Sequence, residues 1–242
     1  MAESLTVISL SSEEFAEAVL ASAPKVAVFD CDGTLWSGDA GTSFMKWTIE
    51  TGLVSREVTD AIDARYRMYL RGEVSEAGIC GEMVQMYQGL RDSEMRRAAR
   101  TFFRHSIEPN IFAEMAALIR DLRASGTEIW AVSSTNDWVI EEGVSRFGIA
   151  PERVLAAKVR VENGTVTNEL VDVPTDEGKV LALARAGVTR PDAVFGNSVH
   201  DAAMLAIARV AFPVNPSPGL VEESSRRGWA VFYPRSVREP AK

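Results

Sequence analysis

Short apolar runs and amphipathic stretches alternate along both ends of the chain. Residues 11–22 have the spacing of a helix, with serines at the start and Pro24 after the end. Residues 25–30 then form a mostly apolar run that is rich in β-branched residues and ends in an aspartate, which is typical of a buried parallel strand. The same pattern predicts further short strands at residues 127–132, 192–195, 210–214 and 229–233.

The middle of the chain has a different pattern. Between about residues 43 and 105 no comparable strand is predicted, and glycines separate four stretches with helical spacing. Residues 153–173 are expected to form two strands around Asn163-Gly164, a pair favoured in tight hairpin turns. Other helices are predicted at residues 111–125 and 176–186. One more is predicted after residue 134, ending near residue 147, and another starts near residue 201.

Strands that alternate with helices predict the α/β class, here a doubly wound, Rossmann-like parallel sheet with helices on both faces. The helical stretch interrupts this alternation after the first strand. We therefore expect two domains. Residues 1–36 and 110–242 would form the core, and residues 37–109 an inserted helical domain that acts as a cap.

Polar side chains follow three of the predicted strands. Asp30, Ser133 and Asn197 each come directly after an apolar run, or within one residue of its end. Because the carboxyl ends of parallel strands meet at one edge of a sheet, where ligands of such folds bind, we expect these groups to converge. This convergence places a candidate site at that edge.

Composition narrows the function classes. The chain has 242 residues, of which 46% are hydrophobic, and its net charge of −8 disfavours binding to nucleic acid or to an anionic membrane surface. No apolar stretch approaches the ~20 residues that span a bilayer. The start of the chain lacks the basic and apolar regions of a signal peptide, and two cysteines cannot form a disulfide framework. We therefore expect a cytoplasmic protein.

The string Asp30-Cys31-Asp32-Gly33-Thr34 carries the clearest chemistry. Two carboxylates beside a buried strand are costly unless they are paired, solvated or bound to a cation, and together they could hold Mg²⁺. One carboxylate could attack phosphorus while the other acts as general acid and base. A solvated turn is the alternative interpretation, and it explains Asp-x-Asp alone better than it explains the whole string after an apolar run.

This string, FDCDGTL, resembles the first signature of the haloacid dehalogenase superfamily, whose members are mostly phosphatases. The other signatures follow in order: AVSS at 131–134, Lys179 near a helix start, and Gly196-Asn-Ser-Val-His-Asp201, where the family usually has GDxxxD. The predicted helical insertion matches the position of the family's cap. The sequence AFPVNPSPGLVEESSRRGW also resembles the phosphoserine phosphatase-like branch. The resemblance covers nearly all of residues 25–233.

The resemblance implies a role for each matching residue. Asp30 would attack phosphorus and form an aspartyl phosphate, and Asp32 would protonate the leaving oxygen and then activate water. Ser133 and Lys179 would hold the phosphoryl oxygens. The ligands of Mg²⁺ would be Asp30, the backbone carbonyl of Asp32, position 197 and Asp201. The implied partner is a small phosphorylated substrate, and the oligomeric state is left open.

Asn197 departs from the family pattern, which usually has a ligating aspartate there. An amide oxygen can bind Mg²⁺ but brings no charge. The protein could retain activity with weaker metal binding, or it could be a non-catalytic protein that binds a phosphorylated ligand. We expect activity, because Asp30, Asp32, Lys179 and Asp201 all persist.

Other members of the superfamily narrow the reaction and the substrate. Asp32 argues against dehalogenation, whereas a phosphotransferase or phosphomutase remains an alternative to a hydrolase. Arg71-Gly-Glu-Val-Ser75 resembles a cap segment of phosphoserine phosphatases. However, Glu76 and Met83 stand where that branch has a phenylalanine and a carboxylate-binding arginine, and Asp39 falls where an acidic residue contacts the substrate ammonium. These residues argue against phosphoserine, and they suit a phosphorylated amino alcohol or another small phosphomonoester.

Three arginines, Arg96, Arg100 and Arg104, recur at four-residue spacing and therefore share one face of a predicted helix. We interpret this stripe as a solvated face. The alternative is a basic face of the inserted domain that attracts an anion.

Overall fold

The computed structural model of the protein describes residues 7–235; residues 1–6, on which the expectation about a signal peptide partly rests, and residues 236–242 lie outside this part. Two compact units are present. The core unit comprises the chain up to Gly38, Asn110–Val132, and the chain from Asp176 onward. The inserted unit comprises Asp39–Pro109 and Ser133–Thr175.

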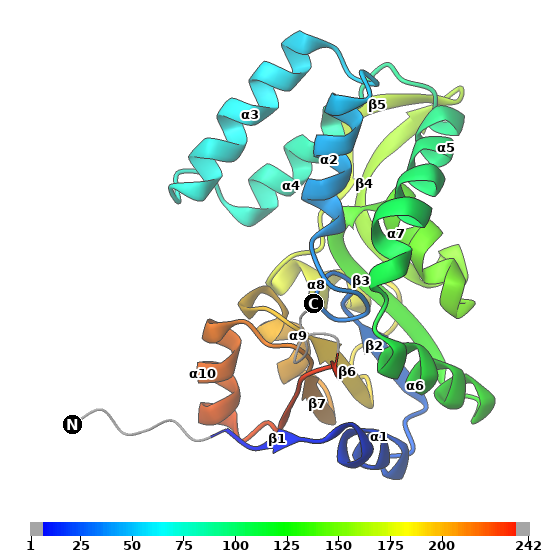
Figure 1. Ribbon diagram of the computed structural model, residues 1–242, viewed down its shortest axis with the longest axis vertical. Coiled ribbons are helices and arrows are strands. Elements are labelled where there is room, and N and C mark those ends of the chain that lie inside the picture. The colour runs from blue at the N-terminus through cyan, green and yellow to red at the C-terminus, as the bar shows by residue number, and fades with distance from the viewer. Residues whose placement is uncertain (1–6, 236–242) are drawn as a thin grey trace. The chain divides into compact units, whose positions relative to one another are not determined.

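A parallel sheet forms the centre of the core unit (Figure 1). Strand β2 pairs in parallel with β3 on one side and with β6 on the other, and β6 pairs in parallel with β7. Strands covered on both faces need nearly continuous apolar sequence, and the interior residues of β2 and β6 are accordingly buried. The bounds are Val26–Phe29 for β2, Glu128–Asn136 for β3, Ala193–Gly196 for β6 and Val210–Pro213 for β7.

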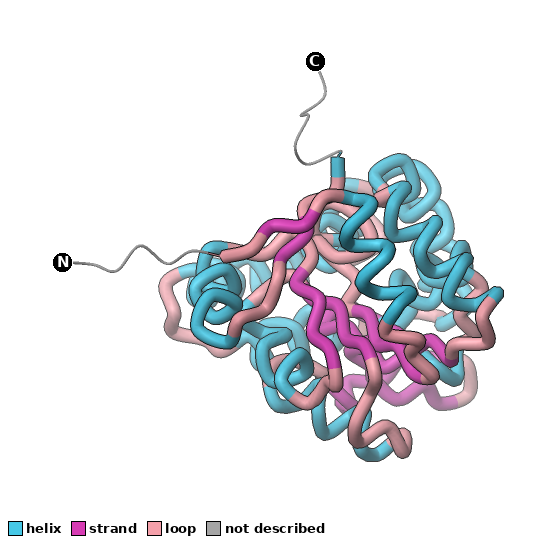
Figure 2. Tube along the Cα trace, turned by 90° about the horizontal axis from the view of Figure 1, so that it is seen from below, coloured by secondary structure: helices cyan, strands magenta, loops and turns pink. Residues whose placement is uncertain are grey.

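Helices cover this sheet on both sides. In Figure 1 the core strands lie between α1 and α6 on one side and α8, α9 and α10 on the other, and Figure 2 shows neighbouring strands side by side with helices outside them. Ser11 and Glu14 form a capping box at the start of α1, as the serine before the helix predicted. The α/β class is confirmed. The bounds are Ser12–Ala21 for α1, Ala113–Ala124 for α6, Glu177–Arg185 for α8, Ala202–Ala206 for α9 and Pro218–Arg227 for α10.

Stacked phenylalanines fill the core beside the sheet. The ring of Phe29 stacks on Phe195 with centroids 4.2 Å apart, and Phe15 of α1 stacks on Phe232 at 4.1 Å. Phe232 belongs to β8 (Val231–Phe232), which pairs in parallel with β1 (Ser9–Leu10). The sequence predicted a strand near β8 but not β1, because two residues are too few to show a period.

The inserted unit contains the predicted helices and the predicted hairpin. Strands β4 and β5 pair antiparallel, and their turn has φ values of 49° at Asn163 and 74° at Gly164, as a type I′ turn requires. The bounds are Ala40–Glu50 for α2, Arg56–Leu70 for α3, Glu76–Gln85 for α4, Asp92–Phe102 for α5, Phe103–Ile107 for a π-helix, Asp137–Val144 for α7, Val154–Glu162 for β4 and Thr165–Asp172 for β5.

The predicted cap at residues 37–109 stays a prediction. In the structure, residues 39–109 share one compact unit with residues 133–175, because α7 packs on α5 and on β4, and α4 also packs on β4. No helix in residues 7–235 is long and apolar enough to cross a membrane.

Asp137, the first residue of α7, has a buried carboxylate. Its Oδ2 lies 3.4 Å from the Lys158 ammonium, and its Oδ1 has no hydrogen-bond partner within the described residues. Burial raises the pKa of Asp137 to about 6, although Lys158 opposes the rise. A carboxyl whose pKa is higher in the folded chain contributes stability at low pH, and this contribution is lost as the pH rises through the folded-state pKa.

We therefore expect Asp137→Asn to gain stability relative to the native chain as the pH rises from about 4 to about 8, by roughly 2–3 kcal/mol. Asparagine does not ionise, so the variant avoids the cost of a buried charge at high pH. Urea unfolding at both pH values measures the difference. Asp121→Asn, at an exposed carboxylate, is the control; an Asp137→Asn effect that is the same at both pH values would contradict the prediction.

Candidate active site

Two buried aspartates lie at the carboxyl ends of the core strands. Asp30 follows β2, and its backbone N–H donates to the carbonyl of Phe195 in β6 at 2.9 Å. Asp201 ends a short 3₁₀ turn, Val199–Asp201, shortly after β6. Both strands run in parallel, so the two aspartates reach the same edge of the sheet, as predicted.

Lys179 joins these two aspartates. Its Nζ lies 2.8 Å from Asp30 Oδ1 and 2.6 Å from Asp201 Oδ1. The three side chains are between 1% and 8% exposed. Buried charges of this kind are stable only when they are paired, and here one ammonium is shared between two carboxylates.

The protonation of this group follows from its burial and its charges. The pKa of Asp30 is raised to about 6, chiefly by burial and also by the charge of Asp201, while Lys179 and Thr34 oppose the rise. Burial alone would lower the pKa of Lys179, but the carboxylates of Asp201 and Asp30 outweigh it and raise that pKa. Lys179 is therefore an ammonium ion at neutral pH.

Two residues of the same loop, to which sequence analysis assigned no role, hold the aspartates of the first signature. The Thr34 hydroxyl donates to Asp30 Oδ2 at 2.8 Å, and the fully buried indole of Trp36 donates to Asp32 Oδ1 at 2.6 Å. Each donor lies four residues after its acceptor, so a turn after β2 brings them together. A hydrogen-bond donor four residues after each aspartate was the signal in the sequence that could have indicated these contacts.

The loop that carries Asn197 contacts the loop of the first signature. The backbone N–H groups of Asn197 and Ser198 both donate to Asp201 Oδ2 at 2.9 Å, which fixes the loop around the aspartate. Gly33 has a φ of +75°, and a Cβ built on it would lie 1.9 Å from Asn197 Nδ2. Glycine therefore permits both the backbone conformation and the close approach of the two loops.

Gly33→Ala is expected to lower the free energy of unfolding by more than about 3 kcal/mol, because overlap with Asn197 adds to the strain of a positive φ. Gly38→Ala is the matched control: Gly38 has a φ of +88°, but no atom lies within 4 Å of its added Cβ. We expect Gly38→Ala to lower the free energy of unfolding by about 1–3 kcal/mol. Urea unfolding of both variants measures the difference, and equal losses would contradict the close approach.

Two predicted site residues belong to the inserted unit. Ser133 is 2% exposed, and its Oγ accepts a hydrogen bond from the N–H of Thr135 at 3.1 Å. Asp39 caps α2, where its two carboxylate oxygens accept from the N–H and the hydroxyl of Thr42 at 2.8 and 2.7 Å. The predicted contacts of Ser133 with phosphate and of Asp39 with substrate stay predictions.

Ser134, which follows Ser133 in β3, lies in a partly buried polar group of the inserted unit. The Cys80 thiol lies 3.6 Å from Glu76 Oε1. Burial raises the pKa of Cys80 and so does Glu76, whereas a hydrogen bond with Ser134 lowers it; Asp39 also acts on this thiol electrostatically. Glu76, which stands where the family segment would have a phenylalanine, therefore contacts the same thiol that bonds to Ser134.

The core unit offers oxygen donors for a metal ion. Asp30 and Asp201 provide two carboxylates, and Asn197, whose side chain lies against Gly33, carries an amide oxygen. Mg²⁺ binds oxygen ligands and usually takes only one or two carboxylates with waters, so this donor set fits it. Within residues 7–235, no group of three or more His, Cys, Asp or Glu side chains is placed to hold a metal.

The comparisons with known proteins agree with this geometry. The family model of haloacid dehalogenase-like hydrolases matches residues 27–206, a range that includes Asp30, Lys179 and Asp201. A histidinol-phosphatase from Neisseria meningitidis serogroup C (strain 8013) is 24% identical over 218 residues, which cover 86% of this chain and 97% of that protein.

Two solved structures have a similar fold. A protein of unknown function from Bordetella pertussis Tohama I matches with a TM-score of 0.77 and 25% identity, covering 86% of this chain and 97% of the other. A substrate-bound phosphoserine phosphatase matches with a TM-score of 0.57 and 16% identity, covering 86% and 92% of the two chains. At that identity the second likeness concerns the fold alone.

Proposed function

As a member of the haloacid dehalogenase-like hydrolase family, this chain is an enzyme of the phosphatase type, and we propose that it hydrolyses a small phosphomonoester through an aspartyl phosphate on Asp30. The observation that carries this proposal is the buried group in which Lys179 bonds to both Asp30 and Asp201. A carboxylate held beside an ammonium at a strand end is suited to receive a phosphoryl group, because phosphoryl transfer depends on positioning and on neutralising charge.

In the first step, an oxygen of Asp30 forms a bond to phosphorus as the bond from phosphorus to the leaving oxygen breaks. Asp32 protonates that oxygen, and Trp36 positions the Asp32 carboxylate through its indole N–H. Lys179 and Ser133 hold the phosphoryl oxygens. Asp32 then takes a proton from water, whose oxygen bonds to phosphorus and releases Asp30 and inorganic phosphate.

Asp30, the Asp32 carbonyl, Asn197 and Asp201 would hold Mg²⁺. The bound ion supplies positive charge that offsets the repulsion between the phosphoryl group and the carboxylates. Asn197 provides no charge of its own, so we expect the affinity for Mg²⁺ to be lower than an aspartate would give.

The Asn197→Asp variant tests this expectation. A third carboxylate should lower the Mg²⁺ concentration for half-maximal rate by about tenfold or more. Phosphate release against Mg²⁺ concentration, in the native chain and in the variant, measures the change. A native chain without turnover beside an active variant would instead favour the non-catalytic binding protein, and no activity in either would overturn the proposed reaction.

For the substrate we propose a phosphorylated amino alcohol. Asp39 and Glu76 offer negative charge that acts on the Cys80 thiol, and Met83 stands where phosphoserine phosphatases have their carboxylate-binding arginine. The relative named as a histidinol-phosphatase supports the same class, since histidinol is an amino alcohol. We also expect a reducing cytoplasm, with which the two free cysteines are compatible.

A panel of phosphate esters tests the substrate class: histidinol phosphate, phosphoethanolamine, phosphoserine, glycerol phosphate and an aryl phosphate, each with Mg²⁺ or with EDTA. The proposal expects metal-dependent release, with the amino alcohol esters hydrolysed faster than glycerol phosphate. Glu76→Gln should reduce that preference by roughly tenfold, because it removes a charge and keeps the shape. A preference for phosphoserine or glycerol phosphate would overturn the substrate class but leave the reaction.

A further inference from the structure

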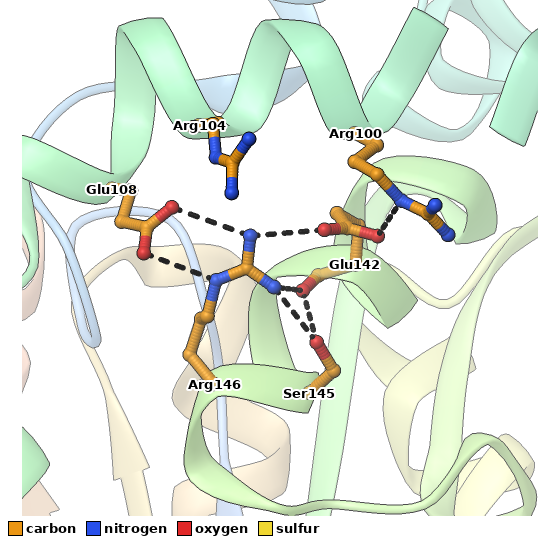
Figure 3. Close-up of a pocket in the computed structure, with 6 residues that line it drawn as sticks. All are labelled: Arg100, Arg104, Glu108, Glu142, Ser145 and Arg146. Atoms are coloured by element: carbon orange, nitrogen blue, oxygen red, sulfur yellow. Dashed lines mark hydrogen bonds and ion pairs between the residues drawn. The ribbon is translucent and has the colours of Figure 1, made fainter. Parts of the chain in front are cut away.

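A charged cavity of about 380 Å³ lies within the inserted unit, and none of the residues that line it is assigned a catalytic role. It opens between the segment from α5 into the π-helix Phe103–Ile107 and the segment from α7 into the 3₁₀ turn Ser145–Phe147 (Figure 3). Its lining has three arginines against two glutamates: Arg100, Arg104, Glu108, Glu142, Ser145 and Arg146.

Arg146 is the fixed member of this lining. Its guanidinium lies 3.2 Å from Glu108 Oε1 and 2.9 Å from Glu142 Oε1, and it sits 5.7 Å from the centre of the Phe103 ring. The side chain is 29% exposed. These contacts hold a cationic group on one wall of the cavity and leave little freedom for it to turn away.

Arg104 is the unsatisfied member. Within residues 7–235 its guanidinium has no hydrogen bond or ion pair, and Figure 3 shows it extending toward the guanidinium of Arg146. Arg100 is 69% exposed and contacts Glu142 only at 3.5 Å. Guanidinium groups that face one another repel, and an anion between them would replace that repulsion with charge-assisted hydrogen bonds.

The backbone explains why Arg104 lies there. A π-helix is rare, and it occurs mostly as a single turn at functional sites. Here it spans Phe103–Ile107, and the N–H of Glu108 donates to the carbonyl of Phe103 across its wide turn. The turn therefore places Arg104 and Glu108 on the same cavity, with Arg100 one turn earlier on α5.

We infer that this cavity is a binding site for a small tetrahedral dianion of the phosphate type. Arg104 and Arg100 would bind its oxygens, and Arg146 would supply the third positive charge. A guanidinium matches two oxygens of a phosphate at once, which favours phosphate over a monatomic anion such as chloride. Glu108 and Glu142 offset two of the three charges, so we expect weak binding with a dissociation constant on the order of millimolar.

The Nε–H signals of the arginine side chains in NMR spectra test this site, with inorganic phosphate as the probe and sodium chloride used to keep the ionic strength constant. The signals of Arg104 and Arg146 should shift as phosphate is added, and the shifts should saturate. Sulfate, which is also a tetrahedral dianion, should behave like phosphate. These signals report on the cavity itself, so the outcome does not depend on turnover or on phosphate bound near Asp30.

Two glutamine variants provide the comparison. Arg104→Gln should weaken phosphate binding, read at the Arg146 signal, by roughly fivefold or more. Arg97→Gln, at an exposed residue of α5 that does not line the cavity, removes the same charge and should leave the binding unchanged. Shifts that rise linearly without saturation and match those in chloride, or equal effects of the two variants, would overturn the inference.

Discussion

Replacing Lys179 with methionine is expected to lower the free energy of unfolding by about 3–5 kcal/mol. The ammonium lies 2.8 and 2.6 Å from two carboxylates that are nearly or fully buried, and its loss leaves both charges without their partner. Activity should fall below detection as well, because the same ammonium is proposed to hold the phosphoryl oxygens. Urea unfolding in EDTA measures the stability without a contribution from metal.

A double variant separates charge from packing. Lys179→Met with Asp201→Asn removes one of the two orphaned carboxylates, so it should recover part of the stability lost in the single variant. Lys46→Met, at an exposed lysine of α2, is the matched control and should leave the stability nearly unchanged. A loss under about 1 kcal/mol in Lys179→Met would contradict the shared ion pair as a stabilising element.

Replacing Asp30 with asparagine should abolish turnover, by about 10³-fold or more, while the fold remains. The amide keeps the shape of the side chain but is a poor nucleophile. Lys179 retains Asp201 as a partner, so the variant leaves one ammonium against one carboxylate and no uncompensated charge. Phosphate release measures the rate, and thermal unfolding measures the stability.

The outcome of Asp30→Asn is informative in both directions. Full metal-dependent activity in the variant would exclude Asp30 as the nucleophile. An unfolded variant would show instead that Asp30 is required for the fold, and Asp30→Glu would then test the reaction, because it keeps the carboxylate but shifts its position relative to Lys179.

The core of the site could be predicted from the sequence because its signals are local. The apolar run that ends in Asp30 marks a strand end, and the resemblance to the haloacid dehalogenase superfamily added Lys179 and Asp201 to the predicted site. Asp30, Lys179 and Asp201 meet there within hydrogen-bonding distance. Periodicity also predicted the helices of the inserted unit and the Asn163-Gly164 turn.

Contacts between distant segments could not be predicted in this way. Residues 133–175 join the inserted unit because α7 and β4 pack on its helices, a fact that no local pattern encodes. The arginine stripe is exposed, as interpreted, but the ion pair of Arg96 with Glu141, 45 residues away, was not predicted.

The most direct test of the account is to trap the phosphorylated residue. The enzyme is mixed with Mg²⁺ and an ester that it hydrolyses, and the reaction is quenched in acid. Borohydride then reduces an aspartyl phosphate to homoserine, and peptide mass spectrometry locates the modified residue. The account predicts homoserine at position 30, and none in enzyme kept without substrate. Phosphate release with an unmodified Asp30, or with the modification at another aspartate, would contradict it.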